Sequence, residues 1–169
     1  MNVLEKFKNI DTFIFDVDGV LTDNSLLVTE SGELLRTMNT RDGFAIKYAV
    51  EKGFRVCIIT GGKSAGVSMR LKALGVQDVF SGINDKLKTY NEFISLNNID
   101  PENILYMGDD LPDHDVMRHV GLSTCPADSA PEIIHIAQYI SPLKGGQGCV
   151  RDVIEKVLKL QLKWMAFEQ

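Results

Sequence analysis

Short apolar runs of strand length alternate along this chain with longer stretches of helical pattern, and this alternation constrains the fold most. Three near-continuous apolar runs are typical of strands covered on both faces: TFIFDV (12–17), FRVCIIT (54–60) and NILYMGDD (103–110). Two shorter strands are expected at 120–125 and 137–141, and helices at 41–53, 63–75, 84–98 and 129–137. Neighbouring parallel strands require crossover connections, so this order predicts an α/β fold, a three-layer Rossmann-like sandwich with a mainly parallel sheet.

One segment between the first strand and the first helix breaks the alternation. NSLLVTESGELLRTMN (24–39) contains two short alternating runs on either side of Ser31 and Gly32, which favour a turn. Alternation of period two around a glycine turn predicts a β-hairpin. The hairpin directly follows the end of the first strand, so we expect it to form a flap over whatever binds there.

Composition sets limits on the organisation of the chain and on its partners. The chain has 169 residues, 44% of them hydrophobic, which predicts a single domain over 1–169 with a sizeable core. Its net charge of −5 argues against nucleic-acid binding, and no apolar run is long enough to span a membrane. Cys57, Cys125 and Cys149 are scattered, which favours a reducing cytoplasm over a disulfide framework.

The last part of the chain, 143–169, is expected to form a glycine-containing tail followed by an amphipathic helix. The sequence RDVIEKVLKLQLKWMAF (151–167) has a helical pattern of apolar residues, which predicts a helix packed against the core. Trp164 and Phe167 near its end are candidates for contact with another subunit.

Polar side chains gather where the predicted strands end. Ligands of an open parallel sheet bind outside the carboxyl ends of its strands, so the residues delivered to that edge are the informative ones. They are Asp16 and Asp18 after the first strand, Thr60 and Gly61 after the second, Asp109, Asp110 and Asp113 after the third, and Lys86 at a helix start.

This set of residues suits phosphoryl chemistry. Closely packed carboxylates repel one another unless a cation lies among them, and Mg²⁺ suits carboxylates that share it with a substrate phosphate. Thr60, backbone N–H groups and Lys86 can hold phosphoryl oxygens. One aspartate of the first pair can attack phosphorus, and the other can protonate the leaving oxygen and then activate water.

Several sequence motifs resemble those of a known family. DVDGVLTD, IITGGKS, Lys86 with its loop and YMGDDLPD are similar to the four motifs of the haloacid dehalogenase superfamily of phosphotransferases. NTRDGFAIKYA, MRLKALGV, VGLSTCPADSAPEI and GGQGCVRDVIE resemble its capless subfamily, which contains the 3-deoxy-D-manno-octulosonate 8-phosphate phosphatases. Only about 40 residues separate Asp18 from Thr60, which leaves no room for an ordinary cap domain.

The resemblance implies a role for each motif residue. Asp16 would be the nucleophile and a magnesium ligand. Asp18 would be the general acid and base, with its backbone carbonyl on the metal. Thr60, Gly61 and Lys86 would hold the phosphoryl group. Asp109 would complete the metal ligands, with Asp110 and Asp113 as supporting neighbours.

The resemblance also implies a substrate and an assembly. It implies Mg²⁺-dependent hydrolysis of the eight-carbon sugar acid phosphate in lipopolysaccharide precursor synthesis, by a homotetramer whose hairpins and tails cover neighbouring sites. Arg41 could pair with the carboxylate of the sugar acid, and Arg70 and Gly146 are further substrate-binding candidates. Gly62 departs from the pattern, because members of the family often carry arginine at this place.

Other functions remain open at this point. A phosphatase for a nine-carbon 3-deoxy-keto acid 9-phosphate, or a broad sugar phosphatase, would use the same phosphoryl machinery. A receiver-like signalling module also groups acidic residues, a threonine and a lysine at a sheet edge, but it would keep its phosphoryl group. A noncatalytic scaffold is disfavoured, because every chemical position is filled.

Overall fold

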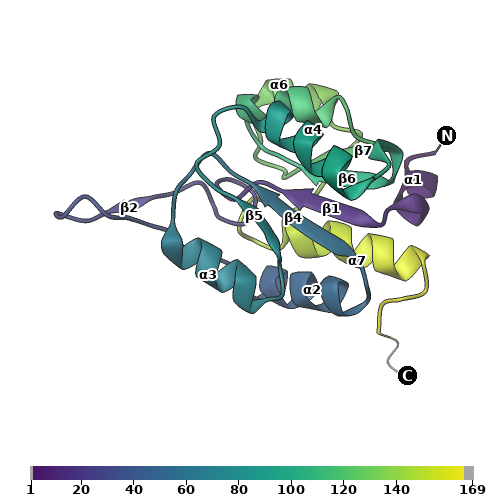
Figure 1. The fold of residues 1–169 in the computed structure, drawn as a ribbon, viewed down its shortest axis with the longest axis horizontal. Coiled ribbons are helices and arrows are strands. Elements are labelled where there is room, and N and C mark those ends of the chain that lie inside the picture. The colour runs from purple at the N-terminus through teal and green to yellow at the C-terminus, as the bar shows by residue number, and fades with distance from the viewer. Residues whose placement is uncertain (1, 166–169) are drawn as a thin grey trace.

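The computed structural model describes residues 2–165 and contains the expected parallel sheet (Figure 1). All six strands are parallel, in the order β5-β4-β1-β6-β7-β8. Their bounds are β1 Thr12–Phe15, β4 Arg55–Ile59, β5 Asp78–Phe80, β6 Ile104–Met107, β7 Leu122–Cys125 and β8 Tyr139–Ile140. The prediction of a three-layer α/β sandwich is therefore confirmed.

Helices cover both faces of the sheet (Figure 1). One face carries α2 (Thr40–Glu51), α3 (Ala65–Ala73) and α7 (Cys149–Leu160). The opposite face carries α4 (Lys86–Asn97), α5 (His114–Met117) and α6 (Pro131–Ile136). Besides a short helix near the N-terminus, the remaining helical pieces within residues 2–165 are 3-10 turns at Pro101–Asn103 and Leu111–Asp113.

Alternating side chains of the strands divide the interior into two cores. Phe13 and Phe15 of β1 point to the core beneath α2 and α7, whereas Ile14 between them points to the core beneath α4 and α5. All four residues of β1 are buried, as expected for a central strand covered on both faces. The parallel pairing of β1 with β4 and with β6 places the carboxyl ends of these three strands side by side.

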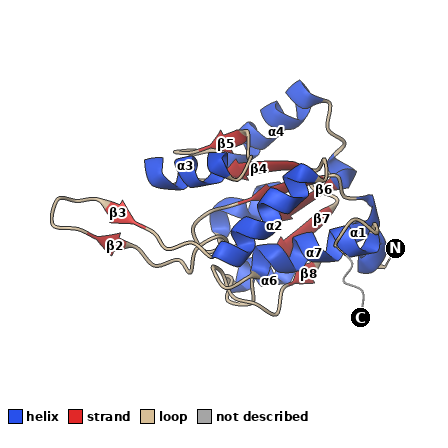
Figure 2. Ribbon diagram, turned by 90° about the horizontal axis from the view of Figure 1, so that it is seen from below, coloured by secondary structure: helices blue, strands red, loops and turns tan. Residues whose placement is uncertain are grey.

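The expected hairpin is present and projects from the sheet (Figures 1 and 2). Its strands are β2 (Leu27–Val28) and β3 (Leu34–Leu35), which pair antiparallel, with Gly32 in the turn at a φ of 85°. All four strand residues are exposed, with Leu27 67% and Val28 63% accessible. Between residues 2 and 165 the insertion after β1 consists of this hairpin alone, with no cap domain.

Some elements differ from the prediction. Two elements were not predicted: α1 (Val3–Asn9), a short helix with an Asn2 and Glu5 capping box, and β5, which has only three residues. The predicted helix over 151–167 ends at Leu160, because Leu162 adopts a left-handed φ of 56°. Trp164 then packs on Phe44 and Tyr48 of α2, and Phe167 lies outside the described residues.

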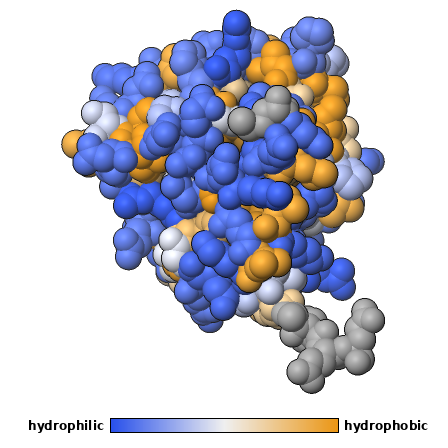
Figure 3. Space-filling view, turned by 90° about the vertical axis from the view of Figure 1, so that its right-hand side faces the viewer, coloured by the Kyte–Doolittle hydropathy of each residue, from blue (hydrophilic) through white to orange (hydrophobic). Residues whose placement is uncertain are grey.

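The surface near the two termini is mostly hydrophilic, with apolar side chains interspersed among the polar ones (Figure 3). Among the helices of residues 2–165, none is both long enough and apolar enough to cross a membrane.

Candidate active site

The parallel register brings the predicted residues to one cleft. Phe15 is paired with Ile58 of β4 and with Met107 of β6, so the residues that follow these strands emerge together. Asp16, Thr60, Lys86 and Asp109 line the resulting cleft of about 320 Å³, and the other lining residues include Asp18, Asn24, Gly61, Gly62, Asp110 and Pro112. The convergence expected from the sequence is therefore present in the structure.

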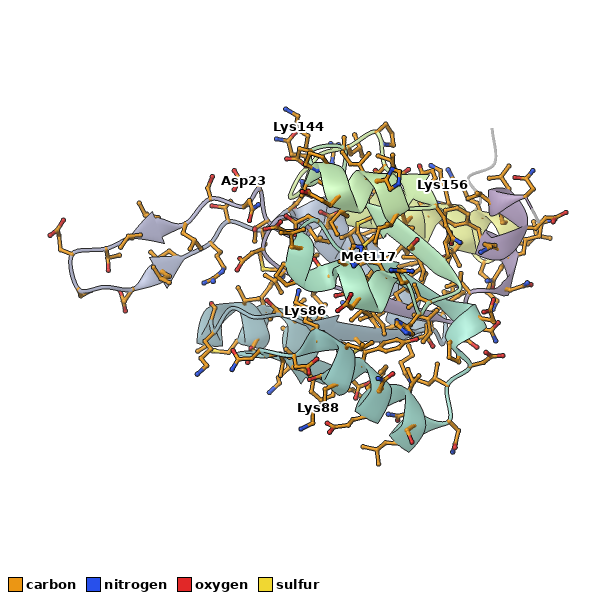
Figure 4. All side chains as sticks on the ribbon, turned by 90° about the horizontal axis from the view of Figure 1, so that it is seen from above. Asp23, Lys86, Lys88, Met117, Lys144 and Lys156 are labelled. Carbon is orange, nitrogen blue, oxygen red and sulfur yellow. The ribbon has the colours of Figure 1, made fainter. Side chains whose placement is uncertain are left out.

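Lys86 connects two carboxylates beneath the cleft. Its Nζ lies 2.9 Å from Asp16 Oδ2 and donates a hydrogen bond of 2.7 Å to Asp113 Oδ1. In Figure 4 it points into the molecule, whereas Lys88, two residues on, points outwards. Burial alone would lower the pKa of Lys86, but Asp16 and Asp113 outweigh burial and raise it. The ammonium is therefore held in its charged form.

Asp113 is fully buried and organises the loop after β6. Its Oδ1 accepts hydrogen bonds from Lys86 and, at 2.6 Å, from the Tyr106 hydroxyl. Its Oδ2 accepts from the backbone N–H groups of Asp109 at 3.0 Å and Asp110 at 3.4 Å. Tyr106 was not predicted as a site residue, although a tyrosine in an otherwise aliphatic buried strand indicates a hydroxyl that needs a partner.

The cleft has more negative than positive charge. Burial, then the Asp113 carboxylate, raises the pKa of Asp16 to about 7. Burial, then Asp16, raises the pKa of Asp109 to about 8. The ligand atoms of Asp16, Asp109 and Asp113 lie within 4.8 Å of one another, with Lys86 as their cationic neighbour. A hard divalent cation fits this set of oxygens and would offset the excess charge.

The bonds already made by Asp113 decide which carboxylates could hold that cation. Each Asp113 carboxylate oxygen already accepts two hydrogen bonds. Asp16 Oδ1 accepts one hydrogen bond of 2.7 Å from the Val17 N–H, and Asp109 Oδ2 accepts one of 3.2 Å from the Asn24 side chain. Asp16 and Asp109 therefore have the oxygen lone pairs to act as ligands, and Asp113 is suited to orienting the loop.

Backbone hydrogen bonds join the loop that follows β4 to β5 and to the segment after β5. The Thr60 N–H donates to Phe80 O at 2.9 Å, and the Ile83 N–H donates to Thr60 O at 3.0 Å. Thr60 Oγ1 accepts from the Gly62 N–H at 3.3 Å. These bonds fix the Thr60 hydroxyl and the Gly61 backbone at the wall of the cleft.

The loop after β1 contributes Asn24, which was not predicted from the sequence. The Asn24 side chain donates to Asp109, and its backbone adopts a left-handed φ of 74°. Thr22 Oγ1 accepts from the N–H groups of Gly19 at 3.2 Å and Asn24 at 3.3 Å, which closes the loop. Asparagine tolerates this backbone conformation better than most residues. An asparagine directly after the DVDGVLTD motif was therefore the one signal in the sequence that Asn24 belongs to the site.

Arg36 is a third site residue, after Tyr106 and Asn24, that was not predicted from the sequence. Its Nε and Nη2 donate to the two Asp18 carboxylate oxygens at 2.7 Å and 3.2 Å. This hydrogen bonding raises the pKa of the guanidinium above its usual value. Arg36 follows the exposed β3, and no local pattern indicates that it reaches back to β1.

The three predicted substrate-binding residues lie outside the lining of the cleft. Arg41 is exposed on α2 and lines a separate hollow with Arg151. Arg70 is exposed on α3. The Gly146 N–H donates to Val20 O at 2.9 Å, and its carbonyl accepts from the Asn39 side chain at 3.2 Å. Within one chain the structure does not bring them to the carboxylates, so their binding role stays a prediction.

The fold and the cleft together define a haloacid dehalogenase-like hydrolase, and residues 75–153 match that family. The 3-deoxy-D-manno-octulosonate 8-phosphate phosphatase of Escherichia coli K12 is 40% identical over 162 residues, which are 96% of this chain and 86% of that protein. The chain belongs to the family of 3-deoxy-D-manno-octulosonate 8-phosphate phosphatases.

Solved structures agree with this assignment. The crystal structure of the Yersinia pestis phosphatase of that name superimposes with a TM-score of 0.93 at 38% identity, over 96% of this chain and 88% of that one. The 3-deoxy-D-manno-octulosonate 8-phosphate phosphatase of Moraxella catarrhalis, solved in complex with a magnesium ion, a phosphate ion and a KDO molecule, gives a TM-score of 0.91 at 32% identity, over 95% of this chain and 92% of that one.

Proposed function

We propose that this protein hydrolyses 3-deoxy-D-manno-octulosonate 8-phosphate to the free sugar acid and phosphate, as a step in lipopolysaccharide precursor synthesis. The observation that carries the proposal is the convergence of Asp16, Thr60, Lys86 and Asp109 in one cleft at the carboxyl edge of the sheet. The relationship to phosphatases that act on this sugar acid supports the choice of substrate.

The proposed cofactor is Mg²⁺, held by the Asp16 and Asp109 carboxylates and the Asp18 backbone carbonyl. The excess of buried carboxylates over ammonium groups supports it, as does the magnesium in the Moraxella catarrhalis structure. When bound, Mg²⁺ would neutralise phosphoryl charge and orient the phosphate. Asp110 and Asp113 would act beside the ligands, through the hydrogen bonds that shape their loop.

The first chemical step is assigned to the aspartate pair. A carboxylate oxygen of Asp16 attacks phosphorus, the phosphorus–oxygen ester bond breaks, and the leaving oxygen takes a proton from Asp18. In the second step Asp18 removes a proton from water, which attacks the aspartyl phosphate, releases inorganic phosphate and restores the Asp16 carboxylate. Two carboxylates two residues apart thereby perform two different roles.

The remaining cleft residues position the phosphoryl group. The Thr60 hydroxyl and the Gly61 N–H would donate to its oxygens, and the Lys86 ammonium, already 2.9 Å from Asp16, would attract it towards the nucleophile. Because Lys86 is held by Asp113 as well, it needs little reorganisation when the substrate binds.

We further propose that the chain acts as a homotetramer in the cytoplasm. The exposed apolar residues of β2 and β3 on a projecting hairpin support an interface between copies, because an isolated monomer would leave them in water (Figure 2). The cleft is not lined by Arg41 or Arg70 of the same chain. In an assembly, Arg41 or Arg70 of a neighbouring copy would come within reach of it. The three unpaired cysteines favour a reducing compartment.

Multiple turnover tests this proposal. Wild-type protein should release many phosphates per chain when Mg²⁺ is present and almost none after chelation, and Asp16→Asn should abolish release. Phosphorylation that stops after one phosphoryl group per chain would instead identify a receiver-like module. Light scattering of the wild type and of Leu27→Glu would test the assembly, with the charged variant expected to dissociate.

A further inference from the structure

Arg36 joins the base of the hairpin to the proposed acid–base residue. Both Asp18 oxygens accept from its guanidinium, at 2.7 Å from Nε and 3.2 Å from Nη2. Within residues 2–165, these are the only hydrogen bonds that the Asp18 carboxylate receives. We propose that Arg36 is a positioning residue that sets the orientation of Asp18 for proton transfer. The inference rests on the proposed phosphatase activity.

The surroundings of Arg36 differ from those of the rest of the hairpin. The strand residues Leu34 and Leu35 are 45% and 47% exposed, whereas the Arg36 side chain is only 4% exposed. Its Nη1 also donates to Leu34 O at 3.2 Å, which ties the guanidinium to its own strand. Arg36 is therefore anchored at the inner end of the hairpin and is not a solvated surface arginine.

Gly62 leaves the space in which this ion pair lies. A Cβ atom at position 62 would be 2.8 Å from Arg36 Nη2 and 2.9 Å from Asp18 Oδ2. Both distances are shorter than ordinary van der Waals contacts, so any side chain there would displace one partner. The loop after β1, the loop after β4 and the hairpin thus meet at this contact.

The chemistry of Asp18 explains why its orientation matters. The side chain is 30% exposed, so without a partner it could adopt several rotamers towards solvent. A planar guanidinium that donates to both oxygens selects one orientation. General acid–base catalysis contributes about 10²- to 10⁴-fold, and a misplaced group forfeits a large part of that factor.

The first test compares leaving groups in single turnovers of the magnesium-loaded protein. For Arg36→Met, release of the sugar from 3-deoxy-D-manno-octulosonate 8-phosphate should slow by about 10- to 100-fold. Release of nitrophenolate from para-nitrophenyl phosphate should change little, because that leaving group needs no proton. Arg36→Lys should restore part of the loss, and Arg118→Met, at an exposed arginine in the loop after α5, should behave as wild type.

Two further variants separate positioning from other roles. Gly62→Ala should reproduce the leaving-group dependence without removing a charge, and it keeps the test valid if Arg36→Met folds poorly. Arg36→Met added to Asp18→Asn should cause no further loss, since there is no acid left to position. An equal loss for both leaving groups, or a further loss in the Asp18→Asn background, would overturn the inference. A wild type inactive on all phosphate esters would overturn the proposed function instead.

Discussion

The Lys86 ammonium and the Asp113 carboxylate form a buried ion pair with an N–O distance of 2.7 Å. Neither residue contributes to the hydrophobic core, yet their side chains are only 4% and 1% exposed. The pair links α4 to the loop after β6, and Lys86 carries the link on to Asp16. The position of Asp16, the proposed nucleophile, thus depends through Lys86 on Asp113, which lies outside the predicted set of catalytic and metal-binding aspartates.

Asp113→Asn should destabilise the protein and impair catalysis. Removing one partner from a buried ion pair costs about 3–5 kcal/mol, because the other charge is left poorly compensated. We expect a loss of unfolding free energy near the lower end of this range, since Lys86 keeps its ion pair with Asp16. Urea unfolding measures the change in unfolding free energy, and kcat/KM should also be lower than in the wild type. Asp115→Asn is the matched control, because that carboxylate is 75% exposed, and an equal effect there would contradict the account.

Tyr106→Phe should have a smaller effect than Asp113→Asn. It removes the hydroxyl that donates to Asp113 at 2.6 Å but leaves the Lys86 bond in place. The net contribution of such a hydrogen bond is about 1–2 kcal/mol. Thermal unfolding of the two variants side by side gives the comparison. A larger loss for Tyr106→Phe would show that Asp113 is oriented mainly by the tyrosine and not by Lys86.

Asn24→Gly should weaken magnesium binding while leaving the fold intact. Glycine keeps the left-handed backbone but loses the side-chain bond to Asp109 Oδ2. Loss of a hydrogen bond to a metal ligand typically lowers metal affinity by about 10- to 100-fold. The magnesium concentration for half-maximal activity should rise by about tenfold. An unchanged value would indicate that Asp109 needs no partner from this loop.

Asp42 should make stability depend on pH away from the cleft. Its Oδ1 accepts from the Arg151 N–H at 2.9 Å at the start of α7, but its buried Oδ2 has no hydrogen-bond partner among residues 2–165. Burial raises the pKa of Asp42 from 3.8 to about 6. The folded state therefore holds this proton more tightly than the unfolded state, so the contribution of Asp42 to stability falls as the pH rises from about 4 to about 6.

Asp42→Asn isolates that contribution, because asparagine does not titrate. Between pH 4.5 and pH 7.5 the wild type should lose roughly 2 kcal/mol of unfolding free energy relative to Asp42→Asn. Urea unfolding of both proteins at the two pH values measures the difference. A gap that stays constant with pH would show that Asp42 is ionised in the folded state throughout.

The sequence predicted the fold and the motif residues because both follow from local patterns. Continuous apolar runs identified β1, β4 and β6, and their carboxyl ends delivered Asp16, Thr60 and Asp109 to one edge. The elements it missed, α1 and β5, have seven and three residues, too few for a clear periodicity.

The supporting contacts could not be predicted in the same way. Arg36 pairs with a residue 18 positions away, and Asn24 with one 85 positions away. Tyr106 and Asp113 are close in sequence, but the Tyr106 hydroxyl can donate to Asp113 only because the loop after β6 folds back. These contacts depend on tertiary packing, which no short motif encodes.

Comparative steady-state kinetics can distinguish the proposed eight-carbon substrate from its alternatives. The kcat/KM should be measured with Mg²⁺ for 3-deoxy-D-manno-octulosonate 8-phosphate, for a nine-carbon 3-deoxy-keto acid 9-phosphate and for simple hexose phosphates. We expect the highest kcat/KM for the eight-carbon substrate and loss of all activity in Asp16→Asn. A higher value for the nine-carbon substrate, or equal values across the panel, would contradict it.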